Sequence, residues 1–128
     1  MNSMEGFHGW WASCGHACRG IAFAFRTQRN LRIHLLIAAA VVAAAILLRF
    51  SRTQLILAIL TVSMVILGEM LNTALEFALN LVEARDHPVV KTAKDIAAGG
   101  VFLAVVGAVI VGLLLFGPPL QALLQNCF

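Results

Sequence analysis

Five polar residues recur at intervals of three or four in an otherwise apolar stretch: Glu69, Asn72, Glu76, Asn80 and Glu83. On a helix that turns about 100° per residue, they fall within an arc of about 80° and form one narrow stripe. A carboxylate can deprotonate a hydroxyl group or ligate a hard divalent cation. The stripe is therefore a candidate catalytic site rather than a solvated helix face.

A second candidate group follows at Lys94 and Asp95, where a long apolar run begins. A lysine there can hold phosphate oxygens, and a helix N-terminus also favours anions. Alone, the pair would be interpreted as interface anchors. Phosphoryl transfer needs a metal, a cation on the phosphates and a group that deprotonates the nucleophile. Glu76 suits a magnesium ion, Lys94 the phosphates and Glu69 an acceptor hydroxyl.

The depth of the two carboxylates favours a lipid acceptor. About 20 helical residues span the hydrocarbon layer. If the helix enters the bilayer near Gln54, Glu69 still lies within this layer, close to its cytoplasmic boundary. Glu76 is about 10 Å closer to water. Burying an ionised carboxylate in a membrane helix costs roughly 2.5–3.5 kcal/mol, which makes a functional role the default interpretation.

Two alternatives compete with a lipid kinase. Glu69 and Glu76 could titrate in a small membrane transporter or proton relay, or the polar residues could hold helices together in a subunit without chemistry. A relay would need polar groups in both halves of the membrane. The outer halves of the apolar runs contain no ionisable residues, which argues against it.

Composition indicates an all-α integral membrane protein with one domain over residues 1–128. The chain is 61% hydrophobic and 12% charged, whereas a soluble domain has about 25% charged residues. The basic residues flank apolar runs instead of covering one face of a soluble module, which excludes nucleic acid as a partner.

Four segments are predicted. Residues 1–33 mix aromatic residues with arginines and form an amphipathic interfacial helix. Transmembrane helices follow at 34–50, 54–82 and 92–116. Small residues recur every four positions in the last span and predict close packing between helices: Gly100, Ala104, Ala108 and Gly112.

The flanks of these segments set the orientation and the expected end of the last helix. Seven basic residues lie in the N-terminal segment and in the loop near Pro88, against Arg49 and Arg52 on the opposite side. This distribution predicts a multi-pass plasma-membrane protein with a cytoplasmic N-terminus. Pro118 and Pro119 are expected to end the last helix.

The three cysteines, Cys14, Cys18 and Cys127, give no disulfide framework. His16 lies between the first two, but a structural zinc site normally uses four ligands. Reduced thiols near the membrane surface are the preferred interpretation.

Three motifs resemble the prokaryotic diacylglycerol kinases: Arg29-Asn30-x-Arg32-Ile33-His34, Glu69-x-x-Asn72-Thr73-Ala74-x-Glu76 and Lys94-Asp95-x-Ala97-Ala98-Gly99. The first is similar to the branch that includes undecaprenol kinases. The resemblance covers nearly the whole chain. It implies a bacterial inner-membrane homotrimer with sites shared between subunits, Mg-ATP as phosphoryl donor, and diacylglycerol or undecaprenol as acceptor.

The resemblance also implies residue roles. Glu69 would be the catalytic base that also contacts the lipid, with Asn72 in support, and Asn30 and Ala98 would border the lipid. Glu76 would bind the metal. The remaining residues would line the nucleotide site: Gln28, Glu76, Arg85, Asp86, His87, Lys94 and Asp95.

Two positions depart from the family pattern. Gln28 stands where family members often carry a glutamate that is a second metal ligand. Glutamine offers a carbonyl oxygen to a cation but no charge. Asn80 likewise replaces an aspartate of relatives.

Overall fold

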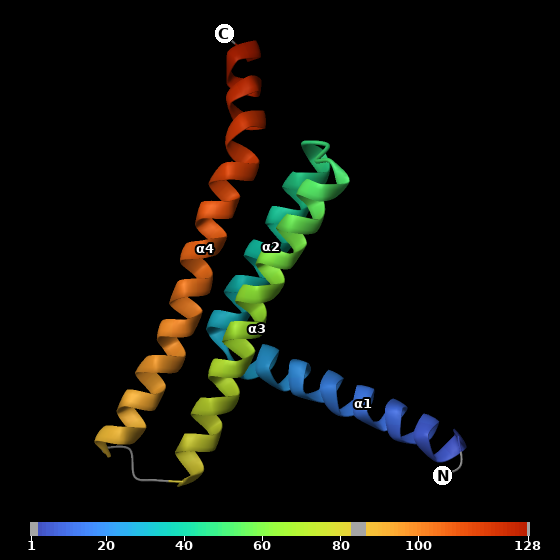
Figure 1. Cartoon of the computed structure of the whole chain (residues 1–128), viewed down its shortest axis with the longest axis vertical. Helices are drawn as coiled ribbons and strands as arrows, with labels where there is room; N and C mark the ends of the chain where they lie inside the picture. Colours follow the sequence, from blue (N-terminus) through green and yellow to red (C-terminus); the bar gives the residue numbers. More distant parts are fainter. Residues whose placement is uncertain (1–2, 83–86, 128) are drawn as a thin grey trace.

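The structure, a computed structural model, describes residues 3–82 and 87–127, and within these ranges every regular element is an α-helix (Figure 1). The elements are α1 (Ser3–Thr27), α2 (Arg29–Leu47), α3 (Arg52–Val82) and α4 (Pro88–Cys127). Three of them, α2, α3 and α4, are long and apolar enough to cross a membrane. These findings confirm the all-helical prediction and the three spans.

Helix α3 is the centre of the bundle, because it packs against α2 and against α4. Small residues such as Ala38, Ala45 and Ala58 are buried in the bundle, and short side chains let helix backbones approach closely. Most large apolar side chains are exposed instead. An apolar exterior of this kind suits lipid as the surrounding medium.

The turn between α2 and α3 is fixed by capping at both ends. Arg49 has a φ of 55°, and the N–H of Phe50 donates to the Ala45 carbonyl at 3.0 Å, which is the pattern of a Schellman motif. Ser51 then starts α3, since its N–H donates to Gln54 Oε1 at 2.9 Å and its Oγ accepts from the Gln54 N–H at 3.3 Å. The two helices therefore reverse direction within four residues, 48–51.

The first two helices meet at one non-helical residue, Gln28, with φ −103° and ψ 113°. Its N–H still donates to the Ala24 carbonyl at 2.8 Å, and its carbonyl accepts from the Arg32 N–H at 3.4 Å. The chain changes direction sharply here, so α1 leaves the bundle at a steep angle (Figure 1). Helix α2 thus begins at Arg29, earlier than the expected 34, and ends at Leu47 rather than at 50.

The bounds of α4 correct the prediction of 92–116 at both ends, whereas α3 differs from the expected 54–82 only in its start. Proline is tolerated in the first turn of a helix, where no N–H is needed, so Pro88 begins α4 instead of preceding it. At the other end the helix continues through Pro118 and Pro119. The preceding residue, Gly117, has no Cβ to clash with the proline ring.

Candidate active site

Glu69 lies inside the helix packing rather than on the outer surface. Its side chain is 4% exposed, and Thr73, one turn further along α3, is 6% exposed. Within the part of the chain that the structure describes, no hydrogen bond reaches the Glu69 carboxylate. The Glu69 carboxylate is therefore available to a ligand that reaches it.

Antiparallel pairing gives the level of Glu69 in the bundle. Counting equal numbers of residues along α2 and along α3 from the turn that joins them places Glu69 opposite Asn30. On the other side, a Cβ at Gly68 would lie 3.9 Å from Val101 of α4. Glu69 is therefore level with the start of α2, where α1 joins the bundle. The ends of α3 and α4 continue past this level (Figure 1).

Asn72 and Glu76 form a polar pair one to two turns beyond Glu69. Asn72 Nδ2 donates to Glu76 Oε1 at 3.2 Å. Asn72 Oδ1 is buried and has no hydrogen-bond partner among the described residues. An orphaned amide oxygen beside a carboxylate matches the oxygen ligands that magnesium takes. The residues present therefore fit the predicted cation, although the described part of the chain holds no cluster of three His, Cys, Asp or Glu.

Lys94 extends the row of polar residues on α3 from the neighbouring helix α4, and this row together with Lys94 is called the polar path. Its Nζ donates to Asn80 Oδ1 at 2.8 Å, so the two helices bring Lys94 to the end of the α3 stripe. Asp95 follows it and is exposed. The antiparallel pairing places Asp95 at the level of Glu76, but no contact joins their carboxylates in the described chain.

The other predicted site residues are less tightly placed. His87 caps α4, because its Nδ1 accepts from the Val89 N–H at 3.3 Å. Gln28 is half-buried at the break between α1 and α2, whereas Asn30 and Ala98 are exposed. Three further residues, Glu83, Arg85 and Asp86, lie outside the described ranges.

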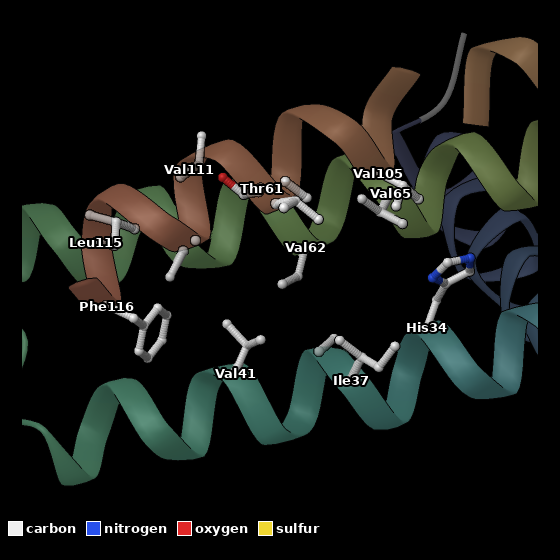
Figure 2. A pocket seen from close by; sticks show the side chains of 15 residues that line it. His34, Ile37, Val41, Thr61, Val62, Val65, Val105, Val111, Leu115 and Phe116 are labelled. Carbon is white, nitrogen blue, oxygen red and sulfur yellow. The ribbon is translucent and has the colours of Figure 1, made fainter. Parts of the chain in front are cut away.

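A groove of about 320 Å³ runs between α2, α3 and α4. Figure 2 shows His34 at one end and Phe116 at the other, with valines along the walls. On α3 the lining includes Ala58, Val62 and Val65. Glu69 follows Val65 after four residues, so it continues the same helix face. The groove ends at Val65 on α3, and Glu69 lies one helical turn beyond that end.

The groove was not predicted from the sequence. The small residues of the last span suggested close packing, yet a Cβ at Gly100 or Gly112 would meet nothing within 4 Å. Instead, Ala108 and Gly112 line the groove wall. The glycine that lets α4 approach α3 is Gly68. The sequence feature that could have indicated the groove is the run of small and β-branched residues on α4.

The cysteine segment shows only local contacts. Cys14 and Cys18 are free thiols on α1, half-buried and exposed respectively. His16 Nδ1 accepts from the Arg19 guanidinium at 2.8 Å. These contacts give the segment no role in the polar path described above.

Comparisons with known proteins identify the family of this chain. The sequence profile of the prokaryotic diacylglycerol kinases matches residues 15–116. A diacylglycerol kinase of Synechocystis sp. is 44% identical over 110 residues, which cover 85% of this chain and 63% of that protein. The undecaprenol kinase of Bacillus subtilis is 39% identical over 105 residues, covering 82% of this chain and 85% of the relative.

A more distant relative is a diacylglycerol kinase of Pseudomonas aeruginosa, 31% identical over 90 residues, which cover 70% of this chain and 73% of that protein. The matched region includes α2, α3 and the part of α4 that carries Lys94 and Asp95. The chain therefore belongs to the prokaryotic diacylglycerol kinase family, a family of lipid phosphotransferases with an alcohol acceptor.

Proposed function

We propose that this protein is an ATP-dependent lipid kinase that transfers the γ-phosphoryl group to the hydroxyl of a membrane lipid. One observation carries the proposal. An apolar groove lies along one face of α3 and ends one helical turn before the buried Glu69. The same face continues to the Asn72–Glu76 pair and the Asn80–Lys94 contact. A lipid chain suits the first part of this path and a nucleotide phosphate the second.

Glu69 acts as the general base in the proposed reaction. The lipid hydroxyl reaches the Glu69 carboxylate from the groove and gives up its proton to it. The hydroxyl oxygen forms a bond to the γ-phosphorus, the bond from that phosphorus to the β,γ-bridging oxygen breaks, and ADP leaves with the electron pair. Glu69 then returns its proton to water.

Asn72 and Glu76 hold the magnesium ion, which neutralises phosphate charge when bound. The orphaned Oδ1 of Asn72 and the second oxygen of Glu76 are the available ligands. Gln28 is a third candidate ligand, since antiparallel counting places it near the level of Asn72. Its amide oxygen lacks the charge of a glutamate.

Lys94 holds the phosphate oxygens of ATP, and its contact with Asn80 keeps its ammonium group at the end of the polar stripe. Asp95, two turns into α4, and His87, just before the helix begins, line the nucleotide. The family resemblance implies that Arg85 and Asp86, which lie outside the described residues, also contact the nucleotide.

A homotrimer accounts for the residues that one copy leaves exposed. Asn30, Asp95 and Ala98 are exposed and Gln28 is half-buried in a single chain, and no side-chain hydrogen bond among the described residues joins them to the polar path. Their levels along the bundle nevertheless match it, so a neighbouring copy can bring one set to the other. We place the N-terminus on the cytoplasmic side of a bacterial plasma membrane, with α1 as an amphipathic interfacial helix, because basic residues gather on that side.

The acceptor is diacylglycerol, giving phosphatidic acid, or undecaprenol, giving undecaprenyl phosphate. Both present a primary hydroxyl near the headgroup level. The test offers purified protein γ-labelled ATP and magnesium with each lipid in turn, and follows label in the extracted lipid. Transfer to either lipid supports the proposal, whereas transfer to neither contradicts it.

A further inference from the structure

Helix α4 is too long for the membrane it crosses. It has 40 residues, which at about 1.5 Å per residue extend roughly 60 Å. The hydrocarbon core measures about 30 Å, and a tilt of about 40°, the upper end of the observed range, would not bring the helix within it. A substantial part of α4 therefore lies outside the hydrocarbon layer.

An aromatic contact shows where α4 leaves that layer on the side away from the candidate active site. Phe116 packs on Phe50 with ring centroids 4.7 Å apart. Phe50 belongs to the turn between α2 and α3, beside Arg49 and Arg52, and such charges mark the membrane surface. Residues 117–127 continue past this turn, as Figure 1 shows for the red end of α4.

This projecting segment has one apolar face and no charge. Residues 117–127 contain no Asp, Glu, Lys or Arg. Leu120, Leu123 and Leu124 share one face by their spacing and are 49–63% exposed. Gln121 and Gln125 occupy another side. A straight helix would hold the leucine face in water, so this face needs a cover.

The helix has a bending point next to the membrane surface. Pro118 and Pro119 have no N–H, so the carbonyls of Leu114 and Leu115 receive no helical hydrogen bond from them. Sharp bends in helices occur at such positions. The exposed Leu113 of α4 lies on the same side of the helix as Leu120, so an apolar face before the prolines continues into the leucine face beyond them.

We propose that residues 117–127 form an interfacial helix that bends at Gly117–Pro119 and docks on the membrane surface next to the turn between α2 and α3. The occupant of the leucine face is the boundary between lipid headgroups and acyl chains. Because the segment carries no charge, its docking depends on apolar burial and not on anionic lipid. This inference does not depend on the proposed kinase activity.

Site-directed spin labelling tests the proposal on the full chain. The three native cysteines are replaced by serine, and single labels are attached after Leu123→Cys, Gln121→Cys or Ile110→Cys in neutral phosphatidylcholine vesicles. The label at 110 is the reference for the hydrocarbon layer. The label at 123 should collide more often with oxygen than with a water-soluble nickel chelate, which corresponds to a depth of about 5–10 Å. The label at 121 should collide with the nickel chelate instead. Mixing in phosphatidylglycerol should leave both unchanged.

Two results would overturn the docking. Equal nickel accessibility at 121 and 123 would mean that the segment stands in water. Exclusion of both reagents with dipolar broadening would mean that a second copy covers the leucines. Pro118→Ala combined with Pro119→Ala tests the bend, because it restores two N–H donors and should cost the label at 123 its oxygen preference. An unchanged preference would disprove the bend.

Discussion

The residues of α3 divide the proposed chemistry by their position along one face. Glu69 is buried and level with the start of α2, whereas Glu76 is half-buried and bonded to Asn72. Among the described residues, Glu69 has no hydrogen-bond partner, whereas Glu76 lies beside the orphaned amide oxygen of Asn72, a better place for a cation. Burial and hydrogen bonding thus distinguish the two glutamates, which their depths along the helix had already separated.

Replacing Glu69 by glutamine should remove the base while keeping the shape of the side chain. We expect Glu69→Gln to lower kcat by about 10²–10⁴-fold, the usual contribution of general base catalysis, with ATP affinity largely intact. Labelled ATP transfer and nucleotide binding measure the two effects. Unchanged turnover would exclude Glu69 from the mechanism.

Restoring a charge at Gln28 should affect the cation. We expect Gln28→Glu to retain activity and to lower the magnesium concentration for half-maximal activity several-fold, because a carboxylate is a better magnesium ligand than an amide. The matched control is Gln121→Glu, on the projecting segment at the opposite end of α4. A large loss of activity in Gln28→Glu alone would place this residue away from the metal.

At the scale of elements, the pairing of α3 with α4 brings the parts of the site together. Gly68 allows α4 to approach at Val101, and Lys94 reaches Asn80 further along the same pair. The α1–α3 contact is sparser, with Phe23 and Phe77 at 5.5 Å between ring centroids. The nucleotide end of the site therefore depends on α4 more than on α1 within one copy.

A pair of lysines on α4 separates a specific role from a general charge effect. We expect Lys94→Met to raise the KM for ATP at least tenfold, since a cation on the phosphates is lost. Lys91→Met removes the same charge from an exposed position one turn earlier and should change the KM less than twofold. Steady-state kinetics with varied ATP measure both, and equal effects would refute the assignment of Lys94.

At the scale of the whole molecule, three helices leave a groove that ends one helical turn from Glu69, the proposed base. Its volume of about 320 Å³ holds only part of a long lipid. Both ends are defined, with His34 near the acid and Phe116 near the far turn (Figure 2). The arrangement favours a chain lying along the membrane normal with its hydroxyl toward Glu69.

Filling the groove should hinder the lipid without touching the nucleotide. A Cβ at Gly112 or at Gly107 would meet nothing within 4 Å, but Gly112 lines the groove and Gly107 does not. We expect Gly112→Leu to raise the KM for the lipid several-fold with ATP affinity unchanged, and Gly107→Leu to resemble the natural protein. Kinetics with varied lipid in mixed micelles distinguish them, and identical lipid kinetics would argue against the groove as the lipid site.

The sequence predicted the spans well because long apolar runs have few alternatives to membrane helices. It also placed Lys94 correctly beside the α3 stripe, since helix levels follow from residue counts. It could not predict α4 past Pro118, because proline rules describe average helices and not one with a glycine before the prolines. The groove could not be predicted from the sequence either, because a gap between helices depends on how far the three helices diverge from one another.

The break between α1 and α2 at Gln28 has a mechanical consequence. Gln28 alone joins α1 to α2, and its backbone hydrogen bonds to Ala24 and Arg32 restrain the chain on both sides. Any tilt of α1 relative to the bilayer must therefore move Gln28, the third candidate ligand of the proposed magnesium site. We expect a thicker or thinner lipid environment to change the cation requirement of the natural protein, so that the membrane itself sets the working magnesium range.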